Sequence, residues 1–211
     1  MEKITLEHVS KVIKNVEVLK DINVCLQKGK VYGLKGYNGS GKTMLLRMIA
    51  GLIKPTEGTV FIDDKILHKD MDFPEDIGVM IENPNFWSNY TGKEVLYSLA
   101  MINKKIGMSE IDEVLERVEL NPQDKRIIKK YSLGMKKRLG IAQAIMEKPQ
   151  VILLDEPSNA LDKKGVEMVR KIIQDERERG ALIVLASHQN EDLDICDAII
   201  EIEEGRIVGI G

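Results

Sequence analysis

Short apolar runs separated by amphipathic stretches fill most of the chain. Near the N-terminus Ile4, Leu6 and His8 alternate with polar neighbours, a period typical of strands, so residues 1–30 predict antiparallel strands. Other runs are apolar throughout, as expected for strands covered on both faces, and lie at residues 31–34, 151–154 and 181–186. Because helical patterns separate these buried runs, the sequence predicts a parallel sheet with helices on both sides.

The middle of the chain carries a succession of helical patterns. Thr91 and Glu94 have the spacing of a capping box, which predicts a helix from there to about residue 103. Further helices are expected at residues 109–119 and 132–148. These patterns indicate an α-helical subdomain, about residues 83–140, that is inserted in the core.

Shorter strands complete the pattern. We expect strands at residues 59–62 and 77–81 to join the N-terminal strands in one small sheet. Residues 199–202 and 207–210 flank a turn and predict a terminal hairpin. At 211 residues the chain fits one composite α/β domain, residues 1–211, with an N-terminal antiparallel β subdomain beside the parallel core.

Composition argues against several classes of function. The chain has 31 Lys and Arg against 34 Asp and Glu without a basic stripe, so nucleic acid is not an expected partner. Cys25 and Cys196 lie far apart and outside any C-x-x-C spacing, which gives no support for a disulfide framework or a zinc site. The N-terminus lacks a signal-peptide layout and the longest apolar runs are strand-sized, so we expect a cytoplasmic chain. For work at a membrane, another chain must cross the bilayer.

A phosphate-binding loop gives the first indication of chemistry. It fits the pattern G-x-x-x-x-G-K-[ST] and comprises Gly36, Tyr37, Asn38, Gly39, Ser40, Gly41, Lys42 and Thr43. A predicted strand precedes it and a predicted helix follows, so backbone N–H groups and the positive helix end would face an anion. Lys42 would reach the β- and γ-phosphates, and Thr43 could ligate Mg²⁺. The sequence therefore predicts a nucleoside-triphosphate site.

Two adjacent acids follow the buried run at residues 151–154. An enzyme with a phosphate-binding loop needs carboxylates at such a strand end to hold a metal ion and orient a water molecule. Asp155 is the candidate on the metal side, and Glu156 is the candidate general base. Without the upstream loop, such acids are commonly solvated loop residues.

A second candidate phosphate contact lies at residues 131–135, where Tyr-Ser-Leu-Gly-Met opens a predicted helix. Backbone N–H groups there and the Ser132 hydroxyl could contact phosphate. A serine before a helix is more often an ordinary N-cap, which is the alternative interpretation.

Taken in order, these motifs resemble those of the ATP-binding cassette (ABC) ATPases. The order is the phosphate-binding loop, residues 131–135, Asp155-Glu156-Pro157, residues 158–162, and Ser187-His188 after the last buried strand. The resemblance covers essentially the whole chain and implies a P-loop NTPase (RecA-like) core that uses ATP and Mg²⁺. It implies that Thr43 and Asp155 serve Mg²⁺ and that Glu156 polarises the attacking water. His188 would contact the γ-phosphate and the water as a donor.

The resemblance also implies a partner cassette. In the family, Ser132 and Gly134 complete the site of a second, facing subunit, and residues 158–162 lie along that contact. ATP would therefore join two cassettes. We expect an ATP-dependent homodimer and poor hydrolysis by the monomer.

Three positions depart from the commonest family pattern. Glu82 stands where most members carry glutamine, which places an acid near the metal ion, where it can ligate; a solvated loop acid is the alternative. Leu133 replaces a glycine within residues 131–135. Ile13 aligns where an aromatic ring normally stacks on adenine, with Val16 nearby, so the base contact is expected to be aliphatic and less selective.

Aromatic residues gather after Glu82 as Phe86, Trp87 and Tyr90. Such a cluster is either an exposed docking patch for a membrane subunit or part of the core of the helical insert. Because large aromatic side chains are mostly buried, we expect Trp87 to be packed.

Residues 82–84 and 131–139 further resemble small export cassettes that protect Gram-positive bacteria from lantibiotics and bacitracin-like peptides. The predicted function is an ATP-binding and hydrolysing subunit of an ABC transporter that drives a separate membrane subunit, exporting peptide antibiotics or similar amphiphiles. That subunit would hold the chain on the inner face of the cell membrane. The alternatives are a soluble ABC ATPase acting as an assembly or scaffold factor, and an importer subunit.

Overall fold

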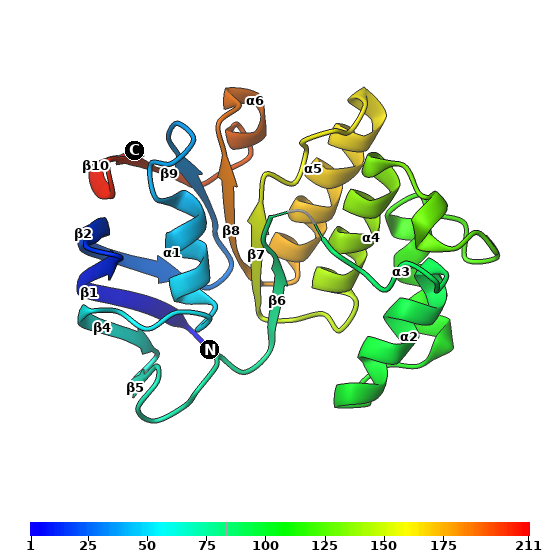
Figure 1. The fold of residues 1–211 in the computed structure, drawn as a ribbon, viewed down its shortest axis with the longest axis horizontal. Helices are drawn as coiled ribbons and strands as arrows, with labels where there is room; N and C mark the ends of the chain where they lie inside the picture. Colours follow the sequence, from blue (N-terminus) through cyan, green and yellow to red (C-terminus); the bar gives the residue numbers. More distant parts are fainter. Residues whose placement is uncertain (83) are drawn as a thin grey trace.

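The computed structural model describes residues 1–82 and 84–211 and has the predicted α/β fold (Figure 1). The strands of its larger sheet are β3 (Val31–Lys35), β6 (Ile77–Met80), β7 (Val151–Asp155), β8 (Leu182–Ser187), β9 (Ala198–Glu203) and β10 (Arg206–Ile210). Their order across the sheet is β10-β9-β3-β8-β7-β6. β10 and β9 form the predicted antiparallel hairpin, and the strands from β9 to β6 pair in parallel.

The smaller sheet is antiparallel. Its strands are β1 (Lys3–Ile13), β2 (Val16–Gln27), β4 (Glu57–Ile62) and β5 (Lys65–Ile66), in the order β2-β1-β4-β5. The alternation predicted for β1 breaks at His8, which is exposed and has a φ of 51°, in the left-handed region. The register shifts there between Leu6 and Val9, so a bulge turns Val9 into the core in place of His8.

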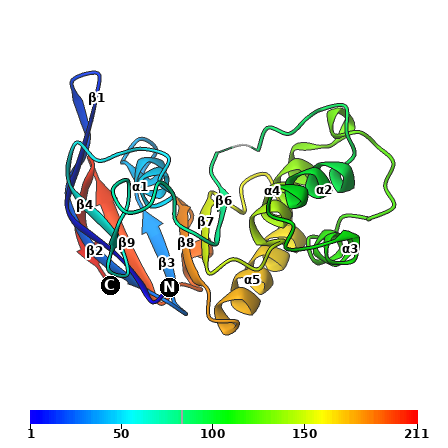
Figure 2. The same ribbon diagram turned by 90° about the horizontal axis from the view of Figure 1, so that it is seen from below.

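Helices cover both faces of the larger sheet. They are α1 (Lys42–Ile49), α2 (Gly92–Asn103), α3 (Met108–Arg117), α4 (Leu133–Ile145), α5 (Lys163–Glu178) and α6 (Asn190–Leu193), with a 3₁₀ turn, η1 (Ile128–Lys130). One apolar core contains α1 and both sheets, and a second core lies on the opposite face under α4 and α5 (Figures 1 and 2). In the described ranges, none of these helices has the length and apolar character needed to span a membrane.

The strand predicted at residues 77–81 does not join the smaller sheet. β6 pairs in parallel with β7 and forms an edge of the larger sheet. Gly78 permits this position, because a Cβ atom there would lie only 1.7 Å from the carbonyl oxygen of Ala144 in α4. A glycine thus lets α4 pack directly on the strand backbone. The prediction of a single small sheet was wrong for this segment.

Of the helices between β6 and β7, α4 packs on the larger sheet, and α2 and α3 lie beyond it (Figure 2). α2 begins at its predicted cap, where the Thr91 hydroxyl accepts a hydrogen bond from the Glu94 N–H at 3.3 Å. The Glu94 carboxylate accepts from the Thr91 N–H at 2.7 Å, which completes the capping box. Apolar side chains of α2, α3 and α4 share one core with α5.

Candidate nucleotide-binding site

A cavity of about 590 Å³ opens at the carboxyl ends of the parallel strands. Its walls come from the β1–β2 hairpin, the loop between β3 and α1, the end of β7 and the β9–β10 turn. The side of the cavity formed by the loop includes Tyr37, Asn38, Gly39, Gly41, Lys42 and Thr43. Ligands of open α/β sheets bind at this end of the strands, so the position agrees with a nucleotide site.

The loop at residues 36–43, called the P-loop below, is shaped by its glycines. Gly39 and Gly41 have φ angles of 85° and 116°, which glycine adopts without steric strain. The Lys42 ammonium donates to the carbonyl oxygens of Gly36, at 2.6 Å, and Tyr37, at 3.1 Å. A buried charged donor therefore lies inside the P-loop.

Gly36 and Ser40 lie behind the wall of the cavity. A Cβ atom on Gly36 would come within 2.3 Å of the carbonyl oxygen of Ile202, so the P-loop packs directly on β9. The Ser40 side chain is buried against the same glycine. Gly36 and Ser40, which were predicted to bind the nucleotide, therefore support the P-loop by packing and do not line the cavity.

The two residues predicted to serve the metal ion meet at the base of the cavity. Thr43, in the first turn of α1, donates its hydroxyl to Asp155 Oδ2 at 2.8 Å. Asp155 ends β7 and is buried, with 5% of its surface exposed. The N-terminal end of α1 faces the same place, and its unpaired N–H groups favour negative charge there.

Glu156 turns the chain sharply after β7. Its φ of 49° lies in the left-handed region, which is uncommon for a residue with a side chain. One carboxylate oxygen, Oε1, lies 2.8 Å from Nδ1 of His188, which follows β8. The other oxygen, Oε2, is buried and has no hydrogen-bond partner among residues 1–82 and 84–211. The structure thus brings Glu156 and His188 together at the cavity.

Lys137 is a buried cation close to these acids, and the sequence did not single it out. It lies on α4 with 4% of its surface exposed, and its ammonium donates to the backbone carbonyl of Asp155 at 3.3 Å. Burial lowers the pKa of Lys137, and the nearby carboxylates of Asp155 and Glu156 oppose that shift.

Ser132 and Gly134 do not line the cavity. Ser132 is exposed and acts as the N-cap of α4, because its hydroxyl accepts from the Met135 N–H at 3.2 Å. Leu133 between them is 55% exposed. Within one molecule this segment therefore has the ordinary capping role, and it presents its surface to solvent.

Of the two residues predicted to contact the adenine base, one lines the cavity. Val16 lines the cavity, whereas Ile13 does not, although the two residues are cross-strand partners in the β1–β2 hairpin. The ring of Tyr37, 54% exposed, lines the same cavity, and its hydroxyl accepts from the Glu204 N–H at 3.3 Å. Sequence reasoning assigned Tyr37 only as part of the P-loop and missed Val18, Glu204 and Gly205.

Glu82 follows β6, which pairs in parallel with β7, the strand that ends at Asp155. The exposed carboxylate of Glu82 pairs with Arg47 of α1, with Oε1 and Nη2 separated by 2.8 Å. Glu82 is not among the residues that line the cavity. The carboxylate is bound to Arg47 in this conformation, and its place at the metal ion stays a prediction.

The exposed and packed members of the aromatic cluster differ from those predicted. Trp87 is 56% exposed and Tyr90 is 48% exposed, with their ring centroids 6.0 Å apart. Phe86 is partly buried against the helical core. The expectation that Trp87 is packed was wrong, and Phe86 takes that position.

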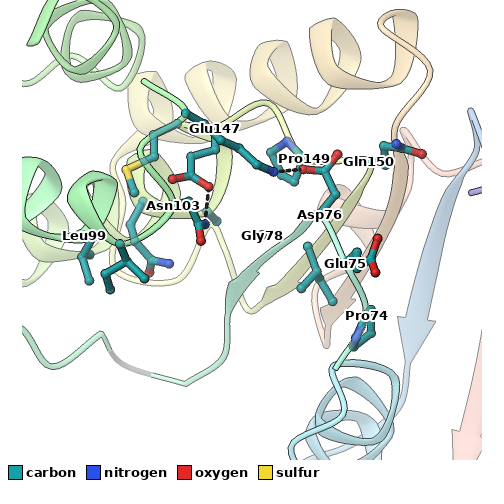
Figure 3. Close-up of a pocket in the computed structure, with 15 residues that line it drawn as sticks. Pro74, Glu75, Asp76, Gly78, Leu99, Asn103, Glu147, Pro149 and Gln150 are labelled. Carbon is teal, nitrogen blue, oxygen red and sulfur yellow. Dashed lines mark hydrogen bonds and ion pairs between the residues drawn. The ribbon is translucent and has the colours of Figure 1, made fainter. Parts of the chain in front are cut away.

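A larger cavity of about 760 Å³ lies at the opposite end of β6, close to the ends of α2 and α4 (Figure 3). Two polar pairs lie in its lining, since Lys105 binds Asp76 at 2.6 Å and Asn103 binds Glu147 at 2.7 Å. It contains no P-loop residue and no residue of the Glu156–His188 pair. Size alone therefore does not identify the functional site.

A parallel sheet, a P-loop that leads into a helix, and a Thr–Asp pair at the end of a second strand define a P-loop nucleoside-triphosphate hydrolase. The sequence matches the family described as ABC transporter over residues 19–159. The chain therefore belongs to the ABC transporter family.

Relatives extend this match over nearly the whole chain. An uncharacterized ABC transporter ATP-binding protein of Bacillus subtilis, YybJ, is 46% identical, over 95% of this chain and 92% of its own length. The bacitracin transport ATP-binding protein BcrA of Enterococcus faecalis is 38% identical, over 97% of this chain and 68% of its own length. The lantibiotic transport ATP-binding protein SrtF of Streptococcus pyogenes is 34% identical, over 90% and 82% respectively.

Solved structures give the same result for the fold. A dimeric bacterial ABC transporter cassette, MJ0796, superposes with a TM-score of 0.89 at 27% identity, covering 99% of this chain and 97% of the other. A post-hydrolysis dimer of MJ0796 with ADP and Pi gives a TM-score of 0.87 at 26% identity, covering 99% and 97%. The chain is the ATP-binding subunit of an ABC transporter and an ATPase. Cassettes of this family work as dimers with a transmembrane partner.

Proposed function

We propose that the chain dimerises on ATP and drives a separate membrane subunit that exports peptide antibiotics or similar amphiphiles. The observation that carries the hydrolytic part is the pair of contacts after β7, where Asp155 meets Thr43 and Glu156 meets His188. The cargo is supported by the similarity to the bacitracin transport protein BcrA and the lantibiotic transport protein SrtF.

Lys42 and the backbone N–H groups of the P-loop bind the phosphates of ATP in this proposal. Thr43 and Asp155 fit Mg²⁺, because they offer adjacent oxygen atoms and Mg²⁺ takes few protein ligands beside phosphate and water. When bound there, Mg²⁺ would neutralise negative charge on the β- and γ-phosphates. Glu82 would be a further oxygen ligand, in competition with its contact to Arg47.

Glu156 acts as the general base that orients the attacking water. The contact of Oε1 with His188 fixes the direction of the carboxylate, which would accept the proton of that water. His188 is exposed beside it and serves as a donor to the water and the γ-phosphate. In this proposal the adenine base lies near the β1–β2 hairpin at Val16, with Ile13 as its cross-strand neighbour.

Ser132 and Gly134 serve the site of a second copy of the chain. They lie outside the cavity of their own molecule, and Ser132 faces solvent at the start of α4. The dimeric state of the similar cassette MJ0796 supports a homodimer. Closure by ATP and opening after hydrolysis would then supply the motion for transport.

The helical subdomain, about residues 83–140, is the proposed place of contact with the membrane subunit. The exposed aromatic pair of Trp87 and Tyr90 supports a docking patch there, because exposed aromatic clusters are common in interfaces. Through that subunit the chain would lie on the inner, cytoplasmic face of the cell membrane.

Glu156→Gln tests the hydrolytic and dimeric parts together. The amide cannot accept the proton of water, so the variant is expected to bind ATP, lose hydrolysis and accumulate as a dimer. Light scattering with ATP and Mg²⁺ measures the dimer, and bound nucleotide is quantified in the same sample. A monomer with bound ATP would contradict the proposal that ATP joins two copies of the chain.

Gentle extraction of the tagged chain from its native cells tests the transport assignment. A stoichiometric multi-span membrane protein, identified by mass spectrometry, is expected to co-purify with it. A soluble partner would instead favour the assembly or scaffold factor, while an importer would be indicated by the cargo of the membrane partner.

A further inference from the structure

The peptide group between Asp155 and Glu156 is held from both sides. Its N–H, from Glu156, donates to the carbonyl oxygen of Ala186 in β8 at 2.9 Å. Its carbonyl, from Asp155, accepts from the Lys137 ammonium at 3.3 Å. Both hydrogen-bonding groups of this peptide are therefore used, one by the sheet and one by α4.

The orientation of this peptide sets the position of the Glu156 carboxylate. Glu156 has the left-handed φ of 49°, a conformation that a residue with a side chain keeps only when its surroundings hold it. In this conformation Oε1 reaches His188 at 2.8 Å, while Glu156 lines the nucleotide cavity. A rotation of the peptide would move the carboxylate away from both.

α4 is firmly packed where it supplies Lys137. Gly78 of β6 lies directly beneath Ala144, and a Cβ atom on Gly140 would lie 2.8 Å from Pro84, so both glycines allow close approach of α4. The Lys137 side chain is 4% exposed and runs from this helix to the end of β7. The ammonium thus has a fixed place beside the peptide, and Asp155 and Glu156 are the acids that offset its charge.

We propose that Lys137 is a positioning residue for ATP hydrolysis: its ammonium holds the Asp155–Glu156 peptide and thereby keeps the Glu156 carboxylate on His188 and at the cavity. This inference rests on the proposed role of Glu156. Because α4 also begins at Ser132, the same side chain connects the surface offered to a second copy with the general base. A shift of α4 on dimerisation would then reach Glu156 through Lys137.

The test compares steady-state ATP hydrolysis of Lys137→Met and Lys137→Gln with that of the unchanged chain. Methionine fills similar space without a donor, so kcat is expected to fall about tenfold to a hundredfold, as for a small misplacement of a catalytic group. KM for ATP and the dissociation constant for ATP are expected to stay within about twofold, because the P-loop is untouched. Glutamine keeps an N–H donor and is expected to recover part of kcat. Lys171→Met, an exposed change on α5, is the control and is expected to match the unchanged chain.

A double variant separates positioning from general damage to the fold. In the Glu156→Gln background, adding Lys137→Met is expected to leave the residual single-turnover rate unchanged, because the carboxylate it positions is already gone. The proposal would be overturned if Lys137→Met lowered the rate of Glu156→Gln by the same factor as it lowers the rate of the unchanged chain. An unchanged kcat in Lys137→Met, or an effect on KM alone, would also overturn it. If Lys137→Met does not fold, as judged by thermal denaturation, the same comparisons are made with Lys137→Gln, which is expected to show a smaller loss of kcat. A Glu156→Gln variant that still hydrolyses ATP would instead remove the proposed role of Glu156, whatever Lys137 does.

Discussion

The ion pair between Arg47 and Glu82 competes with any role of the Glu82 carboxylate at the metal ion. Oε1 of Glu82 lies 2.8 Å from Nη2 of Arg47, so a role at Mg²⁺ would use a carboxylate that the guanidinium already binds. If Glu82 ligates Mg²⁺, Glu82→Gln is expected to retain hydrolysis and to require more Mg²⁺, because a neutral amide is a weaker ligand than a carboxylate. Titration of Mg²⁺ at a fixed ATP concentration measures the midpoint of activation.

Arg47→Met is the matched variant for that titration. It releases Glu82 and is expected to lower the Mg²⁺ midpoint, the opposite direction from Glu82→Gln. Both side chains are partly exposed, so losing the pair is expected to cost less than about 1 kcal/mol of stability. If the Mg²⁺ midpoint is unchanged in both variants, Glu82 forms the ion pair with Arg47 and has no role at the metal ion.

The two thiols are expected to differ strongly in reactivity. Cys25 is exposed on β2, whereas burial raises the pKa of Cys196 to about 12. At pH 8 only on the order of one part in ten thousand of Cys196 is then thiolate, and the thiolate is the form that reacts with an alkylating reagent. Iodoacetamide is expected to label Cys25 selectively in the native chain, as measured by peptide mass spectrometry.

Labelling in guanidinium chloride provides the reference, because both thiols are exposed in the unfolded chain. Equal labelling of the two cysteines in the native chain would contradict the raised pKa and the partial burial of Cys196. The packing reason is specific: a Cβ atom on Gly33 would lie 2.9 Å from Cys196 Sγ, so the thiol fills space beside β3.

Residues within contiguous motifs could be assigned from the sequence, whereas much of the cavity wall could not. Fixed spacing identified Lys42 and Thr43, and the strand before Asp155 identified the acids. Glu204 and Gly205 carry no such signal, since they reach the site only because β9 pairs with β3 and brings the β9–β10 turn beside the P-loop. The position of Lys137 beside the acids could not be predicted from the sequence either, because its hydrogen-bond partner is a backbone carbonyl, which has no sequence motif.

The start of α2 depends on a local cap whose loss can be measured. Thr91→Ala removes the hydroxyl that accepts from the Glu94 N–H and is expected to destabilise the chain by about 1 kcal/mol. Denaturant unfolding followed by circular dichroism measures the change. Ser98→Ala is the control on the same helix: its exposed hydroxyl only donates to the Glu94 carbonyl, so a change within about 0.5 kcal/mol is expected. Equal losses in both variants would contradict a special role for the cap.

Elements with their own local signal were predicted well, and the element without one was misplaced. The capping box at Thr91 and the turn before β10 fix local structure whatever surrounds them. β6 has four residues without polar alternation, so its partner is chosen by packing. Gly78 allows α4 to lie on it, and that long-range contact places β6 beside β7.

The proposed hydrolytic site is divided between two surfaces of one molecule. The P-loop and Glu156 line the cavity, while Ser132 lies outside it at the start of α4. Packing of α4 against β6 and β7 fixes this separation within one chain. A complete site in the proposed homodimer therefore needs Ser132 from a second copy, and each dimer would hold two equivalent sites by symmetry.

Mixing two inactive variants tests that division. Glu156→Gln lacks the general base but keeps Ser132, and Ser132→Arg blocks the α4 surface but keeps Glu156. In the mixed dimer one site combines the intact Glu156 of one copy with the intact Ser132 of the other, so hydrolysis is expected to return. With random pairing and independent sites, the initial rate is expected to reach about a quarter of the unchanged chain's rate, since half the dimers carry one working site of two. The variants are mixed before ATP is added, because Glu156→Gln is expected to remain dimeric once ATP binds. Phosphate release no greater than the sum of the two variants alone would show that the copies do not complete each other's sites.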